Sequence, residues 1–240
     1  MSYPGYLHEV LIGKQSAFVT PVSATKDIGI VMDTSDNFSR EIIKSYGMGS
    51  QQVQAINTGM FDPKFSCTVE FQHGRLLEYI FGGVGHGATS GDTTHTFALA
   101  DAPLYATIES SNNSATDTAL THTGMFIESA ELSLALNETL KLKTDWVGCN
   151  TVSSASATSA VVSTQPVFPH GMFTVSFGGQ TATLVQSVSI KITKSQLRVG
   201  GVSSKNYQVG NTSVIDFEFN MQLGFADKTF QELYLGSTTN

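Results

Sequence analysis

The chain carries the run Phe65-Ser-Cys-Thr-Val-Glu-Phe71, followed after two residues by Gly74-Arg-Leu-Leu-Glu-Tyr-Ile-Phe-Gly82. In the first part, apolar side chains alternate with polar ones, which is the period of a strand that buries one face. In the second part, the pattern becomes that of a short apolar helix, and Gly82 suits the positive φ of a helix C-cap. This stretch therefore predicts a half-buried strand followed by a short helix.

The end of the chain repeats the same order. The run Val214-Ile-Asp-Phe-Glu-Phe-Asn-Met221 alternates as the first strand does, and Thr229-Phe-Gln-Glu-Leu-Tyr-Leu-Gly236 has the pattern of a second short helix. A strand–helix unit that appears twice indicates a duplicated plan.

We therefore expect a single domain over residues 1–240 with two half-repeats, at about 40–149 and 166–236. The segment 150–165 consists almost entirely of Thr, Ser, Ala and Val, and it is predicted to be a mobile loop or an extended arm between the halves.

The remaining sequence predicts mostly strands. A strong hairpin is expected over 124–146, with its turn at Asn137. Residues 40–46 fit either a helix or a strand. Long loops are expected at 83–91, 110–121 and 195–212, and a turn at Lys14–Ser16. Shorter strands are expected from alternating runs at 8–22, 27–33, 94–100, 104–109, 173–177 and 185–192. The predicted fold class is all-β, a β-sandwich or barrel with one or two short helices.

The charge composition limits which kinds of partner the protein surface can bind. Charged residues make up 14% of the chain, against roughly 25% in ordinary soluble proteins, and the formal net charge is -7. Wrapping of nucleic acid needs clustered Lys and Arg, so the composition argues against it. A neutral or acidic channel that lets nucleic acid pass remains compatible with this charge.

The sequence offers no constellation typical of an enzyme. It has no Gly-x-Ser-x-Gly elbow, Walker loop or kinase signature. His86, Asp92 and His95 are close enough in sequence to meet in a loop, but a solvated loop is the simpler interpretation. Cys67 and Cys149 fit neither a disulfide framework nor zinc spacing, and Cys67 is expected to be a buried thiol. We predict no catalytic, cofactor-binding or metal-binding residues.

The chain is not expected to insert stably in a membrane. The N-terminal residues lack the basic and apolar regions of a signal peptide, and no run approaches the ~20 apolar residues of a membrane span.

Long strands with polar outer faces suit an assembly. Edge strands can pair with those of a neighbouring subunit, and a head-to-tail contact that closes produces a ring. The segments 150–165 and 195–212 are then the expected bridges between subunits or rings.

Three stretches together resemble the tail tube proteins of tailed phages and tailed archaeal viruses. They are Gly59-x-Phe61…Phe65-x-Cys-x-Val-Glu-Phe71…Leu76-Leu77…Phe81-Gly82, then His122-Thr-Gly124…Glu131-Leu-Ser-Leu-Ala-Leu136, and finally Val188-Ser-Ile-Lys-Ile192…Asp216-Phe-Glu-Phe219…Phe230…Leu233-x-Leu-Gly236. The resemblance covers about Arg40 to Gly236.

The resemblance implies a structural virion protein of the tail, assembled in the host cytoplasm. Six subunits would form a ring, each giving strands to a continuous inner barrel. The rings would stack into a hollow tube through which the genome leaves. The implied partners are further copies of the chain, the tape measure, tail terminator and baseplate or tip proteins, and viral DNA in transient contact with the lumen. The family has no catalytic residues to carry over.

Net acidity suits a lumen that repels DNA phosphates and lets them slide. Glu131, Asp216 and Glu218 lie at outward positions of the predicted strands, and we expect them to face the lumen.

The alternative is a β-sandwich binding module that recognises carbohydrate or serves as an adhesin. This alternative predicts an exposed aromatic platform. The single tryptophan, Trp146, instead falls in the apolar pattern of the hairpin and is expected in the core.

Overall fold

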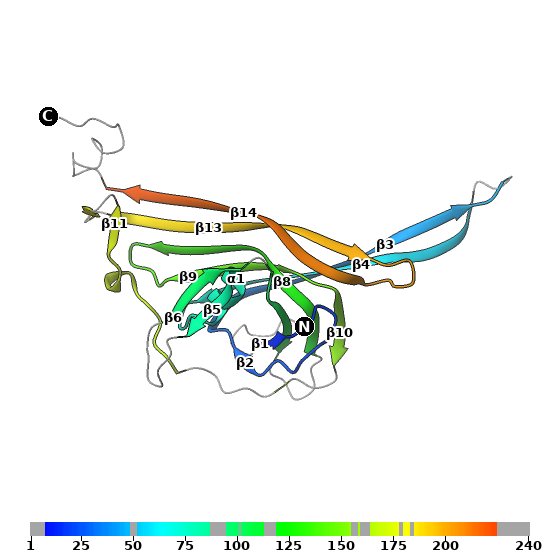
Figure 1. Cartoon of the computed structure of the whole chain (residues 1–240), viewed down its shortest axis with the longest axis horizontal. Helices are drawn as coiled ribbons and strands as arrows, with labels where there is room; N and C mark the ends of the chain where they lie inside the picture. The colour runs from blue at the N-terminus through cyan, green and yellow to red at the C-terminus, as the bar shows by residue number, and fades with distance from the viewer. Residues whose placement is uncertain are drawn as a thin grey trace.

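Two layers of antiparallel strands share one long strand and enclose the core (Figure 1). The computed structural model describes residues 8–48, 52–86, 95–100, 102–112, 119–154, 158, 164–177, 180–182 and 185–224.

The described elements are mostly strands, with one short α-helix and one 3₁₀ turn, His170–Met172. In chain order they are β1 (His8–Gln15), β2 (Lys26–Asp27), β3 (Ile30–Tyr46), β4 (Val53–Glu70), α1 (Arg75–Phe81), β5 (Gly82–His86), β6 (His95–Leu99), β7 (Tyr105–Asn112), β8 (Ala119–Ala135), β9 (Lys141–Val147), β10 (Asn150–Ser154), β11 (Val175–Phe177), β12 (Gln180–Ala182), β13 (Val185–Gly200) and β14 (Tyr207–Leu223).

The first layer, the long sheet, has the strand order β3-β4-β9-β8-β13-β14. The second layer, the short sheet, has the order β2-β1-β7-β8-β10. Strand β8 passes from the short sheet to the long one, and every pairing is antiparallel. Two smaller hairpins, β5–β6 and β11–β12, lie outside these layers.

The predicted strand–helix unit is confirmed in the first half of the chain. Phe65, Cys67 and Val69 of β4 are buried, and α1 follows and ends at Gly82, which has φ 83°. The amide of Gly82 donates to the carbonyl oxygen of Glu78, as a C-cap requires. The second predicted helix, 229–236, lies outside the described residues.

The core forms between the two layers and α1. Tyr79 of α1 packs edge-on against Trp146 of β9, with ring centroids 5.7 Å apart. Residues of β1 and β7 complete the same cluster from the short sheet. The arrangement is a β-sandwich with a flanking helix, which confirms the predicted fold class.

The predicted hairpin at 124–146 is confirmed as β8 and β9, with Asn137 at φ 65° in the turn. Trp146 is buried, and its Nε1 donates to Thr144 Oγ1 at 2.8 Å. The leucines of this hairpin alternate into the core, but Leu136, which follows the last residue of β8, is exposed.

The long loop predicted at 195–212 is wrong. Strand β13 continues to Gly200 and β14 begins at Tyr207, so only the residues between them form a turn. Gly210, which suggested a loop, lies inside β14. A Cβ at this position would approach the ring of Phe18 to 2.6 Å. The glycine permits close packing rather than a turn.

Residues 40–46, which fit either a helix or a strand in the sequence, form the end of strand β3. Other expected loops are also partly strands. Residues 83–86 pair with β6, and 110–112 belong to β7. Lys14 and Gln15 remain in β1, so the expected turn begins later. The strand expected from residue 173 begins at Val175.

The segment 150–165 begins as β10, which pairs with β8. Thr and Val have high strand propensity, so a bland Ser/Thr-rich stretch can form an edge strand. Residues 155–157 and 159–163 lie outside the described part of the chain.

Strands β3 and β4 form a hairpin that extends far beyond the two layers (Figure 1). We call its outer part, from Glu41 to Asn57, the arm. No helix in the described part of the chain is long and apolar enough to cross a membrane.

Candidate functional site: the polar face of the long sheet and the arm

One face of the long sheet carries a row of alternating charges. The register places Lys143 of β9 opposite Glu131 of β8, Glu131 opposite Lys191 of β13, and Lys191 opposite Glu218 of β14. Residues directly opposite each other in antiparallel strands share a face, so these four side chains form one row. Opposite-charge pairs of this kind contribute roughly 0.2–1 kcal/mol each.

A second row runs beside the first on the same face. Asp145 of β9, Ser129 of β8, Thr193 of β13 and Asp216 of β14 lie in register. The hydroxyl of Ser129 donates to Asp145 Oδ2 at 2.6 Å. The three residues singled out in the sequence, Glu131, Asp216 and Glu218, therefore share one face. Glu131 is half-buried between its lysines, whereas the other two are exposed.

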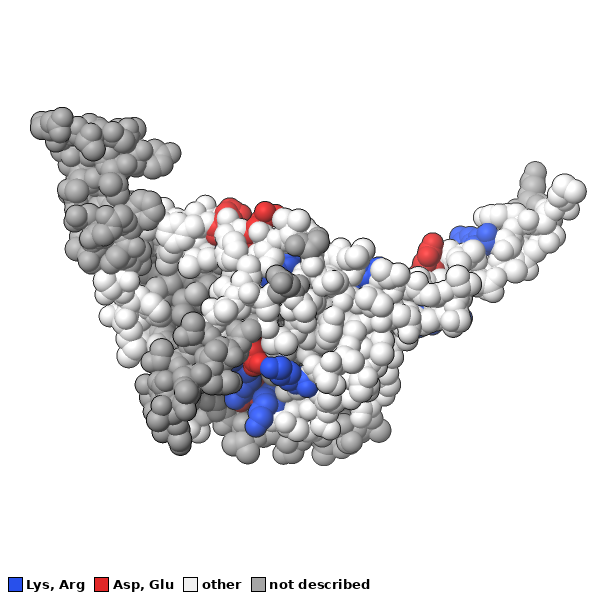
Figure 2. All heavy atoms as spheres, viewed as in Figure 1, with Lys and Arg blue, Asp and Glu red and all other residues white. Residues whose placement is uncertain are grey.

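This face is acidic on balance but not uniformly. The registered rows carry the carboxylates Asp33, Glu70, Glu131, Asp145, Asp216 and Glu218, against the lysines Lys64, Lys141, Lys143 and Lys191. Figure 2 shows acidic side chains on the upper surface, over β13 and β14, with basic side chains near them. The alternation of the sequence places Lys141, Lys143 and Lys191 on outward faces, but it does not predict their carboxylate partners, which lie on strands far away in the chain.

A hollow of about 430 Å³ lies in the same face. It is lined by hydroxyl groups and by two carboxylates and two lysines, from Glu128, Asp145, Lys64 and Lys191. The mixed signs favour neither an anion nor a metal ion.

The arm has a largely apolar face that no described part of this chain covers. Register places Ile42, Tyr46, Val53 and Ile56 on one side of the ribbon, together with Lys44 and Thr58. The first four are exposed, with Tyr46 63% and Ile56 65% accessible. An isolated two-stranded ribbon is marginal in water, so exposed apolar residues along it indicate an interaction surface.

A second uncovered apolar surface lies on the core-facing side of the long sheet near its edge. Phe217 and Phe219 of β14 and Ile190 of β13 face the same way as the core residues, yet the side chains of the phenylalanines are at least half exposed. Neither α1 nor the short sheet covers this end of the layer.

Comparison with known families identifies the family of this chain. Residues 5–239, nearly the whole chain, match the family model described as phage tail tube protein. The chain belongs to the phage tail tube protein family. No curated protein matches it significantly. The family assigns this tail tube protein a structural role in the virion tail, together with other tail proteins.

The tail tube protein also contains a buried histidine with a partner on each ring nitrogen. His122 of β8 lies with Nε2 2.7 Å from Asp36 Oδ1 and Nδ1 2.9 Å from Thr151 Oγ1. Ser110 Oγ donates to the second carboxylate oxygen of Asp36 at 3.2 Å. The side chain of His122 is fully buried, with 0% exposure, so this network ties β3 to β7, β8 and β10. It offers no open position for a substrate.

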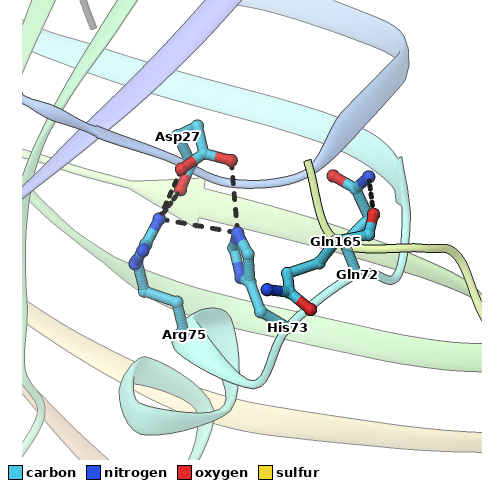
Figure 3. A network of polar contacts seen from close by, with 5 residues as sticks. All are labelled: Asp27, Gln72, His73, Arg75 and Gln165. Carbon is cyan, nitrogen blue, oxygen red and sulfur yellow. Dashed lines mark hydrogen bonds and ion pairs between the residues drawn. The ribbon is translucent and has the colours of Figure 1, made fainter. Parts of the chain in front are cut away.

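A second polar network holds the start of α1 (Figure 3). Arg75 Nη1 donates to Asp27 Oδ1 at 2.8 Å, and His73 Nε2 lies 3.3 Å from Asp27 Oδ2. The side-chain amide of Gln72 donates to the carbonyl oxygen of Gln165 at 2.6 Å. These contacts fix α1 to β2 and to Gln165, the last residue of the Ser/Thr-rich segment.

Both cysteine thiols of the tail tube protein are protonated at neutral pH. Burial raises the pKa of Cys67 to about 12 and that of Cys149 to about 11. A thiol with a raised pKa forms little of the nucleophilic thiolate.

No group of metal-ligating residues occurs in the described ranges. The backbones of His86 and His95 pair across β5 and β6, while Asp92 lies outside the described residues, as do the side chains of both histidines.

Proposed function

We propose that six copies of this tail tube protein form a ring, and that rings stack into a hollow tube that conducts the viral genome during ejection. The observation that supports this best is the long sheet itself. Its apolar face is largely covered by α1 and the short sheet, whereas its polar face is bare and its two outermost strands pair on one side only among the described strands.

The strand order suits closure by repetition. The long sheet has an even number of strands, all antiparallel to their neighbours, so its edge strands β3 and β14 run in opposite directions. If β14 of one copy lies beside β3 of the next, antiparallel pairing continues across the joint. A head-to-tail contact of this kind leaves no free edge once the ring closes.

In this ring we propose that the polar face lines the channel, with Glu131, Asp216 and Glu218 facing the lumen. Its net negative charge would repel DNA phosphates, and the lysines within the rows would keep the repulsion moderate. The same surface explains why a structural protein without a catalytic constellation carries so many ordered charges on one sheet. The role proposed is structural rather than enzymatic.

The arm supplies contacts beyond the ring plane. We propose that its apolar face docks on a neighbouring copy, since no described part of its own chain covers it. The sequence-based expectation placed the bridges at 150–165 and 195–212. We add 41–57 as a bridge because its apolar side chains are exposed, and the bridges at 150–165 and 195–212 stay predictions.

The proposal extends to the partners and the site of assembly. Tape measure, tail terminator and baseplate or tip proteins would meet the ends or the lumen of the tube, and assembly would take place in the host cytoplasm. The alternative of a carbohydrate-binding or adhesin-like module gains no support from Trp146, which is buried.

The test is electron microscopy of the purified protein over a concentration series, with a variant in which residues 44–56 are replaced by an Asn-Gly turn that joins the registered pair Ile43 and Asn57. The native chain is expected to form rings or tubes of constant diameter, and the shortened chain to form few or no stacked tubes. Stacked tubes of normal length from the shortened chain would contradict the role of the arm.

A further inference from the structure

The root of the arm lies against the tip of a second hairpin. The amide of Phe61 in β4 donates to the carbonyl oxygen of Lys205 at 2.8 Å, in the turn between β13 and β14. The Lys205 ammonium donates to Thr58 Oγ1 at 2.8 Å. Figure 1 shows the β13–β14 tip beside β3 and β4 at the place where the arm leaves the body.

Arg198 of β13 is the central side chain of this contact. Its guanidinium forms an ion pair with Asp62 of β4 at 2.6 Å and lies 4.4 Å from the centre of the Tyr207 ring. It also donates to the carbonyl oxygen of Gly148 at 3.3 Å. Only 13% of the side chain is exposed. A planar guanidinium can stack on an aromatic ring and bind a carboxylate at the same time. A lysine ammonium has no planar group to stack.

The β13–β14 tip is itself fixed to the body. The hydroxyl of Tyr105 in β7 donates to the carbonyl oxygen of Gly210 at 2.7 Å. Phe18 and Phe126 pack so closely on Gly210 that a Cβ would meet their rings at 2.6 and 2.8 Å. On the side of the arm, Met60 touches Gly200, where a Cβ would lie 2.4 Å from its methyl group.

The arm ribbon is irregular at this contact. The register of β3 and β4 shifts between Arg40 and Ile42, which marks a bulge. Bulges bend a ribbon and increase its twist. On the body side of the bulge, Arg40 lies over the ring of Phe61 at 5.0 Å, next to the amide that bonds Lys205. The tip therefore contacts the ribbon on both sides of the bulge, at Phe61 and at Thr58.

We propose that residues 198–208, which we call the bracket, set the direction in which the arm leaves the body, and that Arg198 is the positioning residue of this bracket. The bracket packs on the buried core around Phe18 and Phe126 at one end and contacts the root of the arm at the other, so it fixes the arm relative to that core. The arm then presents its apolar face to a neighbouring copy in one orientation. The last step rests on the proposed function, whereas the fixed direction of the arm does not.

The direction of the arm is measured by spin labels in the unassembled protein. One label is placed on the arm at Ser45→Cys and one at the β8–β9 turn at Glu138→Cys, and pulsed dipolar spectroscopy gives the distance distribution between them. Both positions are exposed, whereas the native thiols of Cys67 and Cys149 are buried and stay unlabelled.

The labelled protein is expected to give one narrow distribution. In Arg198→Ala the distribution is expected to become about twofold broader, because the ribbon then loses its ion pair to the bracket beside the bulge and keeps only the contacts of Lys205 and Gly200. Arg198→Lys, which keeps the charge and loses the planar stack, is expected to lie between the two. Lys14→Ala, which removes a remote ion pair with Glu78, is the matched control and is expected to stay narrow.

An unchanged, narrow distribution in folded Arg198→Ala would overturn the proposal. If that variant does not fold, Asp62→Asn carries the same prediction, since it removes the ion pair and leaves the stack on Tyr207.

Tube assembly gives the second readout. Arg198→Ala is expected to need about tenfold more protein to form tubes, because a mobile arm must be ordered during docking. A broad distribution with normal assembly would contradict the docking role of the arm, while the tube and the bracket would stand. A narrow distribution would overturn the bracket and leave the tube untouched.

Discussion

At the scale of single residues, burial decides the chemistry of this chain. Trp146 and Cys67 lie side by side in the long sheet, and both reach the hydroxyl of Thr144: the indole at 2.8 Å and the thiol at 3.2 Å. Each of these groups is nearly inaccessible to solvent. They stabilise the sandwich.

Replacement of Trp146 is expected to be severely destabilising. Trp146→Ala removes the largest buried side chain and its contact with Tyr79, and the expected loss is about 3–5 kcal/mol in the free energy of unfolding. Trp146→Phe, the conservative control, is expected to lose less, because it fills most of the space. Urea unfolding followed by circular dichroism measures both. A loss below about 1 kcal/mol for the alanine variant would show that Trp146 is not part of the core.

The raised pKa of Cys67, about 12, predicts a dependence of stability on pH. In the unfolded chain the thiol has its ordinary pKa of 9.0. The folded state therefore retains the proton to a higher pH. The buried thiol therefore makes its full contribution to the free energy of unfolding below about pH 9, and this contribution falls as the pH rises towards 12. A thiol reagent at pH 8 is expected to label the native protein far more slowly than the urea-unfolded one. Equal rates would contradict the burial of this group.

At the scale of elements, the local ones were predictable. A stretch of about 20 neighbouring residues contains the alternation of β4, the change to the helical pattern of α1 and the C-cap glycine, Gly82. The β8–β9 hairpin was equally clear, because its turn at Asn137 separates two alternating runs. Short-range periodicity and turn chemistry were sufficient for these elements.

The elements that were missed depend on distant contacts. Gly210 reads as a loop residue until Phe18, nearly 200 positions earlier, is seen to occupy the space of its side chain. Similarly, nothing local pairs Glu131 with Lys191, so the charge row could not be predicted even though Glu131, Asp216 and Glu218 were correctly grouped as outward residues. The second half-repeat stays a prediction, since its helix lies outside the described residues.

Strand β14 allows the charge of the polar face to be changed without loss of folding. Asp216 and Glu218 are exposed, so the double change to lysine is expected to alter stability by about 1 kcal/mol or less. In virions that carry this change, genome ejection is expected to slow or stall, because DNA phosphates would bind the channel.

The graded control is Asp216→Asn with Glu218→Gln, which removes the charge without reversing it and should have a smaller effect. Ejection is followed by the release of DNA in a dye assay, at low and at high salt. A defect that salt does not relieve would contradict an electrostatic cause.

At the scale of the whole molecule, the described part of the chain is a sandwich that leaves several surfaces suited to contacts exposed. The arm exposes apolar residues along one face, β14 exposes Phe217 and Phe219, and the long sheet has an unpaired edge on either side in the described part of the chain. Each of these features would be resolved by contact with further copies. Membership of the phage tail tube family gives this exposed surface its explanation.

The most direct measurement is a cryo-electron microscopy map of the assembled protein. The account predicts rings of six copies in which β14 of each copy lies beside β3 of the next, with Glu131, Asp216 and Glu218 facing the lumen. An assembly in which the polar face of the long sheet lies on the outside of the tube, or is buried between rings, would contradict the account.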